Sequence, residues 1–163
     1  MQNKPQANWT YSKREWEAFV DIEKANKKED SIYFGIGILI LGIPGLMFLR
    51  DTSFLIALAF TVPFAFLIPY LRMRLSYQHL RKGIKNPEIK IYFDKLLINN
   101  HEIVLQSKKR RVKSMKIIET ETDMKLLEFD VQWITNKGPT NDEFRIPIPS
   151  DKIEEAVHLI EKY

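Results

Sequence analysis

The densest charge in the chain is a basic segment, KKRRVKSMK, in its C-terminal half. Its cationic side chains are Lys108, Lys109, Arg110, Arg111, Lys113 and Lys116. Basic side chains that reach an anionic membrane surface contribute about 1 kcal/mol each, so the segment is a candidate contact for anionic lipid or for another partner. The alternative is a solvated loop whose charges keep an edge strand from pairing with other chains. No aromatic residues alternate with these charges, so we do not expect nucleic acid as a partner.

The residues that could bind a metal or attack a substrate do not form a recognisable motif. The three histidines, His79, His101 and His158, lie far apart in the sequence. His101 is followed by Glu102 but lacks the second histidine of a zinc-protease helix. The chain has no cysteine, which removes disulfides, thiolate nucleophiles and zinc-finger ligands.

Acidic residues offer a second arrangement with a chemical interpretation. Glu119, Glu121 and Asp123 alternate along the chain and could align as carboxylates, although an exposed sheet face explains them equally well. The sequence contains no Gly-rich phosphate loop and no nucleophile elbow. We therefore expect no enzymatic activity, no cofactor and no bound metal.

Two long apolar runs dominate the first half of the chain. They cover residues 32 to 49 and 54 to 71, each 18 residues without an Asp, Glu, Lys, Arg or His side chain. A helix of that length is about 27 Å long, close to the roughly 30 Å hydrocarbon core of a bilayer. A soluble chain of 163 residues could not cover two such helices on all sides. We therefore predict a transmembrane hairpin over residues 32 to 71, with two spans.

The flanking charges predict the orientation of this hairpin. Residues 1 to 31 and 72 to 91 carry six Lys or Arg each, whereas Arg50 is alone between the spans. Because Lys and Arg concentrate on cytoplasmic flanks, we expect both termini in the cytoplasm and the hairpin in the cell's inner (cytoplasmic) membrane. Neither span contains Asp, Glu, Lys, Arg or His, which disfavours a pump, channel or secondary transporter but leaves open an oligomeric pore of apolar helices.

Small residues within the spans predict where helices approach closely. They are Gly35, Gly42, Gly45, Ala57, Ala59 and Ala65. Such residues allow close packing between membrane helices, either within the hairpin or between copies of the chain.

The N-terminal segment, residues 1 to 31, predicts an amphipathic helix over residues 12 to 27. Ser12 and Glu15 have the spacing of a capping box, and Tyr11 can pack on Trp16 as a hydrophobic staple. Trp9, Tyr11 and Trp16 could stack on a ligand, but this close to a bilayer they are more often interface anchors or packing residues.

Residues 72 to 86 predict a basic juxtamembrane helix or linker, and residues 87 to 163 predict a cytoplasmic β domain. After Pro87 apolar residues recur at every second position, which predicts about six antiparallel strands. The last of these strands covers residues 144 to 148 and is expected at a sheet edge. Ser150 is expected to cap a final amphipathic helix over residues 151 to 162. Its predicted apolar stripe is Ile153, Ala156, Val157 and Ile160. We expect an α+β membrane protein whose β half-barrel, of pleckstrin-homology-like form, is closed by this helix.

Two segments of the β domain resemble a known family. IYFDKLLINN is similar to the opening hairpin, and FRIPIPSDKIEEAVHLIEKY to the closing strand and helix, of the small bacterial membrane proteins called YcxB-like. In that family a short helix and a two-span hairpin precede a pleckstrin-homology-like domain, and this order of parts matches nearly the whole chain. The resemblance implies no catalytic residues.

Two function classes follow from these features. The first is a non-enzymatic, membrane-tethered cytoplasmic module that binds a protein partner or senses an anionic lipid headgroup. The alternative is a self-assembling structural membrane protein whose spans oligomerise.

Overall fold

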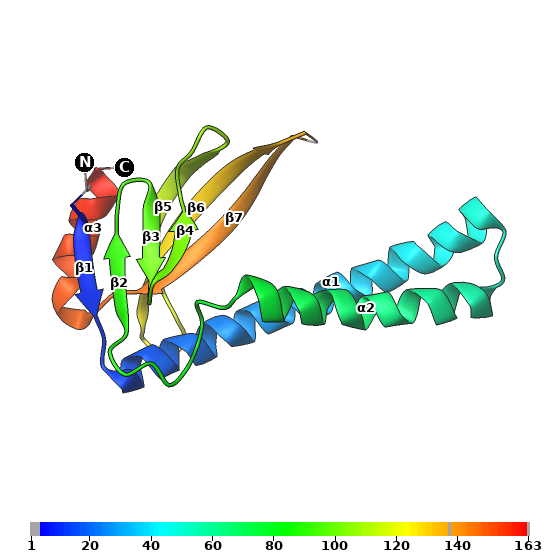
Figure 1. Ribbon diagram of the computed structural model, residues 1–163, viewed down its shortest axis with the longest axis horizontal. Helices are drawn as coiled ribbons and strands as arrows, with labels where there is room; N and C mark the ends of the chain where they lie inside the picture. The colour runs from blue at the N-terminus through cyan, green and yellow to red at the C-terminus, as the bar shows by residue number, and fades with distance from the viewer. Residues whose placement is uncertain (1–3, 137, 163) are drawn as a thin grey trace. The chain divides into compact units, whose positions relative to one another are not determined.

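The computed structural model describes residues 4–136 and 138–162 and shows an α+β protein (Figure 1). Its residues divide into two compact units. The first, which we call the hairpin unit, is Asp21–Leu80, and the second, the β-domain, combines Met1–Val20 with Arg81–Tyr163. The β-domain is therefore built from both ends of the sequence.

Two long helices form the hairpin unit. Helix α1 (Lys13–Arg50) begins in the β-domain and continues through the first apolar run, and α2 (Phe54–Ser76) contains the second. They form an antiparallel hairpin, as predicted (Figure 1). The connection is Asp51, Thr52 and Ser53, and Asp51 has a φ of 48°. Aspartate is among the few non-glycine residues that tolerate this left-handed conformation.

The helix predicted over residues 12 to 27 begins as expected but does not end at residue 27, because α1 runs without a break into the apolar run. No glycine or proline lies between Lys13 and Phe34, and lysine and glutamate are strong helix formers. Lys27 also pairs with Glu23 at 3.9 Å, and the Ser31 hydroxyl donates to the Lys27 carbonyl at 2.8 Å. The polar residues therefore extend the helix instead of ending it.

The basic stretch after the second apolar run is helical over only part of its predicted length. Helix α2 ends at Ser76, and the backbone N–H of Leu80 closes a turn onto the Tyr77 carbonyl at 3.1 Å. Gly83 has a φ of 81°, which glycine adopts without steric cost.

The β-domain contains two antiparallel sheets. The first has the order β1 (Ala7–Thr10), β2 (Glu88–Ile91), β3 (Lys95–Ile98) and β4 (His101–Val104). The second has the order β5 (Arg110–Glu119), β6 (Lys125–Thr135) and β7 (Gly138–Pro147). Within residues 4–136 and 138–162 there is thus one strand more than the roughly six expected.

The unexpected strand is β1, which pairs with β2 in a register that places Trp9 opposite Ile89. Trp9 is fully buried and Tyr11 nearly so, so these aromatics pack in the domain core and are not interface anchors. Four residues are too short to show a period, and their partner strand follows only after α1 and α2. The hairpin unit is therefore inserted between two neighbouring strands of one sheet.

The turn between β3 and β4 agrees with its residues, whereas strand β7 is longer than predicted. Asn99 and Asn100 have φ values of 47° and 68° between β3 and β4, as asparagines in a tight hairpin turn do. Strand β7 begins at Gly138 instead of residue 144, because β6 offers it a partner as far as Thr135. It pairs only with β6 and so lies at a sheet edge, as its prolines predicted.

The C-terminal helix differs from the prediction in its cap and its buried face. A short 3-10 turn, η1 (Ser150–Lys152), precedes α3 (Ile153–Glu161), and no Ser150 side-chain cap bond forms. Ala156 and Leu159 are buried, whereas Val157 is 45% exposed. Helix α3 contacts β5, and the Trp9 indole N–H donates to Glu155 at 3.2 Å. With these contacts, Leu159 instead of Val157 lies on the buried face of the helix.

Candidate functional site

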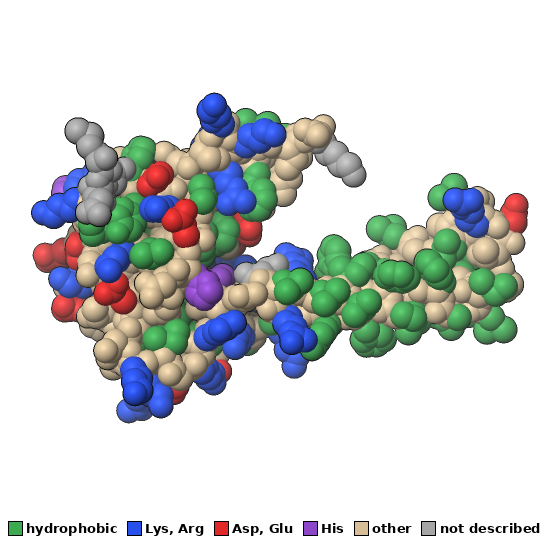
Figure 2. Space-filling model, viewed as in Figure 1, with side chains coloured by type: hydrophobic (Ala, Val, Ile, Leu, Met, Phe, Trp, Pro, Cys, Tyr) green, Lys and Arg blue, Asp and Glu red, His purple; other side chains and the backbone are tan. Residues whose placement is uncertain are grey.

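The hairpin unit carries an apolar outer surface. Among the described residues, all but three of the exposed large apolar side chains lie between residues 32 and 75, and they cover the hairpin in Figure 2. In the most apolar 18-residue windows of α1 and α2, only 6% and 17% of the residues are buried. Core helices of soluble proteins are mostly buried, so this unit lacks the cover that such helices have.

Small residues form the contact between the two helices. A Cβ atom on Gly35 would lie 2.7 Å from the backbone oxygen of Ala65, and one on Gly42 would lie 2.6 Å from Cγ2 of Thr61. Ala57, Thr61 and Ala65, spaced four residues apart, are buried on the facing side of α2. The hydroxyl of Thr61 donates to the Ala57 carbonyl at 2.7 Å, so the contact leaves no unpaired hydroxyl there. This packing is typical of membrane helices.

The prediction of small contact residues is thus confirmed at Gly35, Gly42, Ala57 and Ala65. A Cβ atom on Gly45 would meet no atom within 4 Å, and Ala59 is exposed, so neither residue lies at the contact within the hairpin. Sequence could identify the small residues but not which helix face each one occupies, since that depends on the register of the hairpin.

The basic segment is divided between a turn and strand β5. Lys108 and Lys109 lie in the turn that Ser107 and Arg110 close with a pair of backbone hydrogen bonds. No side-chain ion pair of Lys108 or Lys109 is found in the described part of the chain, and both side chains are exposed. These two lysines are therefore available to an acidic surface.

The first two arginines of the segment bind the neighbouring strand or loop of their own domain. The Arg110 guanidinium stacks on the Trp133 ring, 3.8 Å from its centroid, and donates to the Val104 carbonyl at 3.1 Å. Arg111 donates twice to the Gln132 side chain, at 2.6 and 3.1 Å. Such contacts hold each guanidinium against the sheet instead of presenting it freely to a ligand.

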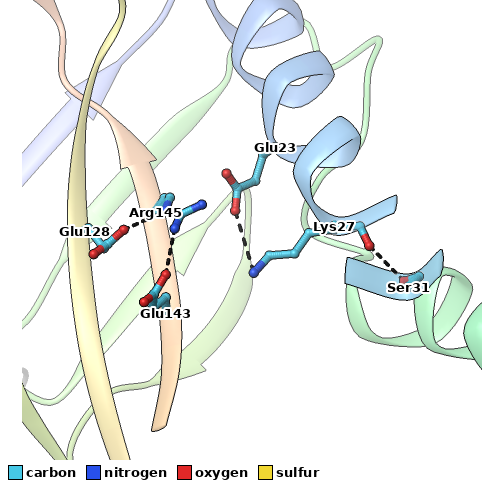
Figure 3. A network of polar contacts seen from close by, with 6 residues as sticks. All are labelled: Glu23, Lys27, Ser31, Glu128, Glu143 and Arg145. Carbon is cyan, nitrogen blue, oxygen red and sulfur yellow. Dashed lines mark hydrogen bonds and ion pairs between the residues drawn. The ribbon is translucent and has the colours of Figure 1, made fainter. Parts of the chain in front are cut away.

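The last two lysines of the segment pair with acids on β6. Lys113 lies 3.8 Å from Asp130, and Lys116 lies 2.9 Å from Glu128. Glu128 also accepts from Arg145 on β7 at 2.7 Å, and Arg145 reaches Glu143 at 2.6 Å (Figure 3). A ladder of alternating charges therefore crosses the three strands of this sheet.

Glu128 is the centre of that ladder, and only 4% of its side chain is exposed. Burial raises the pKa of its carboxyl, but hydrogen bonds and attraction from Arg145 and Lys116 outweigh this and hold the pKa below its usual value. The hydrogen bond between Lys116 and Glu128 also raises the pKa of Lys116. The alternation of the sequence predicts Glu128 on the polar face of its strand but does not give the register that aligns Lys116, Glu128 and Arg145.

The other chemical candidates are not assembled into a site. Glu119 ends β5, whereas Glu121 and Asp123 lie in the turn before β6, so the three acids do not share one strand face. In the described residues, no group of three or more His, Cys, Asp or Glu side chains could hold a metal ion.

No family model matches the sequence, and no curated protein and no solved structure matches it either. The resemblance to the YcxB-like proteins therefore stays a prediction.

Proposed function

We propose that this chain is a two-span protein of the inner membrane that tethers a non-enzymatic interaction or sensing domain on the cytoplasmic side. The observation that carries the proposal is the hairpin unit, whose apolar side chains are outside and whose small residues are inside. Exposed apolar surface of this extent marks a membrane or protein contact. Both helices are long enough to cross a bilayer.

The β-domain is the proposed interaction module, and we assign it the pleckstrin-homology-like arrangement. Support comes from its two antiparallel sheets of four and three strands, followed by one C-terminal helix. Because the hairpin unit is inserted between β1 and β2, two chain connections would hold the domain at the membrane surface.

The partner contact that the geometry favours is the turn of Lys108 and Lys109. The other four cations of the basic segment make side-chain contacts within the domain, and among the described residues Lys108 and Lys109 are the two cations of the segment that form no such contact. Ile134 is 60% exposed, and its backbone N–H donates to the Lys109 carbonyl at 2.8 Å. Two cations beside an exposed apolar side chain suit an acidic protein surface or an anionic headgroup.

Self-assembly through the spans is the alternative, and it has its own supporting observation. A Cβ on Gly37 or Gly45 would meet no atom within 4 Å, so both positions leave room for a second helix. Gly35 and Gly42, by contrast, are already used within the hairpin.

Cysteine labelling tests the membrane proposal directly, because the chain contains no cysteine of its own. A membrane-impermeant maleimide should label Ser53→Cys, in the hairpin turn, in intact cells. It should label Thr122→Cys, in an exposed turn of the β-domain, only after the cells are opened. The reverse pattern would overturn the orientation, and release of the protein by alkaline carbonate would overturn the anchoring.

In-cell crosslinking followed by mass spectrometry tests the interaction role. A partner should co-purify with the wild type and be depleted in Lys108→Glu/Lys109→Glu. The matched control, Lys4→Glu/Lys162→Glu, makes the same change in charge elsewhere on the surface and should retain the partner. Recovery of only the chain itself and lipid would favour self-assembly.

A further inference from the structure

The hairpin unit contains an apolar groove of about 290 Å³ between α1 and α2. Its volume is roughly twice that of an engineered cavity of about 150 Å³ that accepts benzene. The groove is therefore large enough for a stretch of hydrocarbon chain.

The floor of the groove consists of Gly35, Ala65 and Pro69. A Cβ on Gly35 would lie 2.7 Å from the Ala65 carbonyl oxygen and 3.4 Å from Cγ of Pro69. Proline has no N–H, so Pro69 cannot donate to the Ala65 carbonyl four residues earlier. That carbonyl instead faces the Cα hydrogens of Gly35, a weak but recurrent contact between close helices. Because Gly35 has no side chain where the two helices cross, the groove stays open there.

The walls of the groove are open to the surroundings of the hairpin. Ile32, Ile36 and Phe66 line it and are 53%, 45% and 73% exposed. In a bilayer, lipid chains surround such a surface. The groove is thus positioned to be filled from the lipid phase.

Cationic and phenolic groups lie at one end of this groove. Lys28 and Tyr70 line it, and the Tyr70 hydroxyl accepts from Arg74 at 3.5 Å. Lys28 forms no ion pair within the described residues, although Glu29 and Asp30 follow it in the chain. An apolar groove with a lysine and an arginine at one end is complementary to a lipid that carries negative charge at one end of a hydrocarbon chain.

We propose that this groove binds one anionic glycerophospholipid, with an acyl chain on the Gly35–Ala65–Pro69 floor and the phosphate at the Lys28 and Arg74 end. The proposal rests on the proposed membrane insertion and adds a lipid site within the hairpin, separate from the turn of Lys108 and Lys109. A bound lipid would fill the hollow that the glycine and proline create.

Native mass spectrometry of the full chain tests the site. The protein is released from micelles that contain equal amounts of phosphatidylglycerol and phosphatidylcholine with matched chains. The wild type should retain one phosphatidylglycerol molecule in preference to phosphatidylcholine. Lys28→Gln should reduce that preference about five-fold, whereas Lys24→Gln, which removes a charge one turn away and outside the groove, should not.

A pair of matched bulk changes separates the groove from the general lipid surface. Ile36→Phe adds volume inside the groove and should abolish retention, whereas Ile40→Phe makes the same change on the exposed surface and should leave it intact. Equal retention by these two variants, or equal binding of the two lipids, would overturn the site. Carbonate extraction of the same variants distinguishes failure of the lipid site from failure of the membrane anchor. Protein that stays in the membrane but retains no lipid selectively would refute the lipid site and leave the anchor standing.

Discussion

The two units of this chain place their apolar residues in opposite ways. In the β-domain most large apolar side chains are inside, with Trp16, Phe19 and Phe129 fully buried. In the hairpin unit they are outside, with Phe48 84% exposed and Gly35 at the contact between helices. A single chain thus has two opposite kinds of packing.

The difference shows which force holds each unit together. Transfer of apolar surface from water drives folding of the β-domain. In the membrane proposed for the hairpin, lipid chains are as apolar as leucine, so the hairpin would gain its stability from close van der Waals contact and satisfied backbone groups. Matched changes in the two units, or within one of them, should therefore have unequal effects.

The largest expected effect separates two phenylalanines. Phe129→Ala removes a fully buried ring and should destabilise the β-domain by about 3–5 kcal/mol. Phe48→Ala removes an exposed ring and should change stability by no more than about 0.5 kcal/mol in detergent. All three tryptophans lie in the β-domain, so their fluorescence reports its unfolding, and helical circular dichroism, most of which comes from α1 and α2, reports mainly the hairpin.

If Phe48→Ala destabilised the chain as much as Phe129→Ala, the outer surface of the hairpin would be covered by protein instead of lipid or detergent. That result would favour an oligomer of hairpins.

The second prediction compares two glycines of α1. Gly35→Leu places a side chain against the Ala65 carbonyl and should weaken the hairpin by about 1–3 kcal/mol, because the obstacle is backbone that cannot turn aside. Gly37→Leu meets no atom within 4 Å and should be neutral or slightly stabilising. Titration with sodium dodecyl sulfate, followed by helical circular dichroism, measures both. Similar behaviour of the two variants would place the helix contact elsewhere.

The third prediction concerns the charged ladder of the β-domain. In the folded state the pKa of Glu128 lies below its usual value of about 4.5. The ionised Glu128 carboxylate therefore stabilises the folded state fully at pH values above that usual pKa. The stabilisation is lost as the pH falls through the lowered, folded-state pKa. Glu128→Gln should cost about 1–2 kcal/mol at neutral pH and make stability less sensitive to acid. Urea unfolding followed by tryptophan fluorescence over a range of pH measures both effects.

The control for this change is Glu143→Gln, which affects another partner of Arg145. Glu143 is 52% exposed, so its ion pair is screened by water and its loss should cost less than about 0.5 kcal/mol. Equal costs for the two variants would show that Glu128 is not the centre of the ladder.

The sequence was most informative where the pattern is local. The apolar runs, the antiparallel hairpin and the turn at Asn99 and Asn100 follow from period, length and turn chemistry, and the structure agrees. The β1 strand was missed because its pairing with Glu88–Ile91 is long-range and its own four residues carry no period. Propensity extended α1 through Lys27, where the amphipathic pattern alone suggested an end.

The candidate site was harder to predict than the fold. Lys108 to Lys116 appear in the sequence as one basic patch, but strand register assigns Lys116 to Glu128 and Arg111 to Gln132. Only Lys108 and Lys109 remain candidates for the contact predicted for the whole segment. Pairing of charges across strands depends on register, which no local pattern in a single sequence reveals.

The smallest predicted effect concerns helix caps. It compares Ser12, whose side chain caps α1, with Ser150, whose side chain forms no cap bond. The Ser12 backbone N–H donates to Glu15 at 2.9 Å, and the Ser12 hydroxyl accepts from the Glu15 N–H at 3.2 Å. Ser12→Ala should therefore cost about 1 kcal/mol, and Ser150→Ala, which removes no cap bond, less than about 0.5 kcal/mol.

The pKa of Glu15 gives this comparison a second readout. Hydrogen bonds from the Ser12 side chain and backbone lower that pKa, so Ser12→Ala should raise it toward its usual value, as titration followed by nuclear magnetic resonance would show. Because Ser12 begins the helix that continues into the hairpin unit, its cap stabilises the first turn of α1 within the β-domain. The loss should therefore appear in tryptophan fluorescence and leave the detergent titration of the hairpin unchanged. A shift in both signals would show that the two units unfold together.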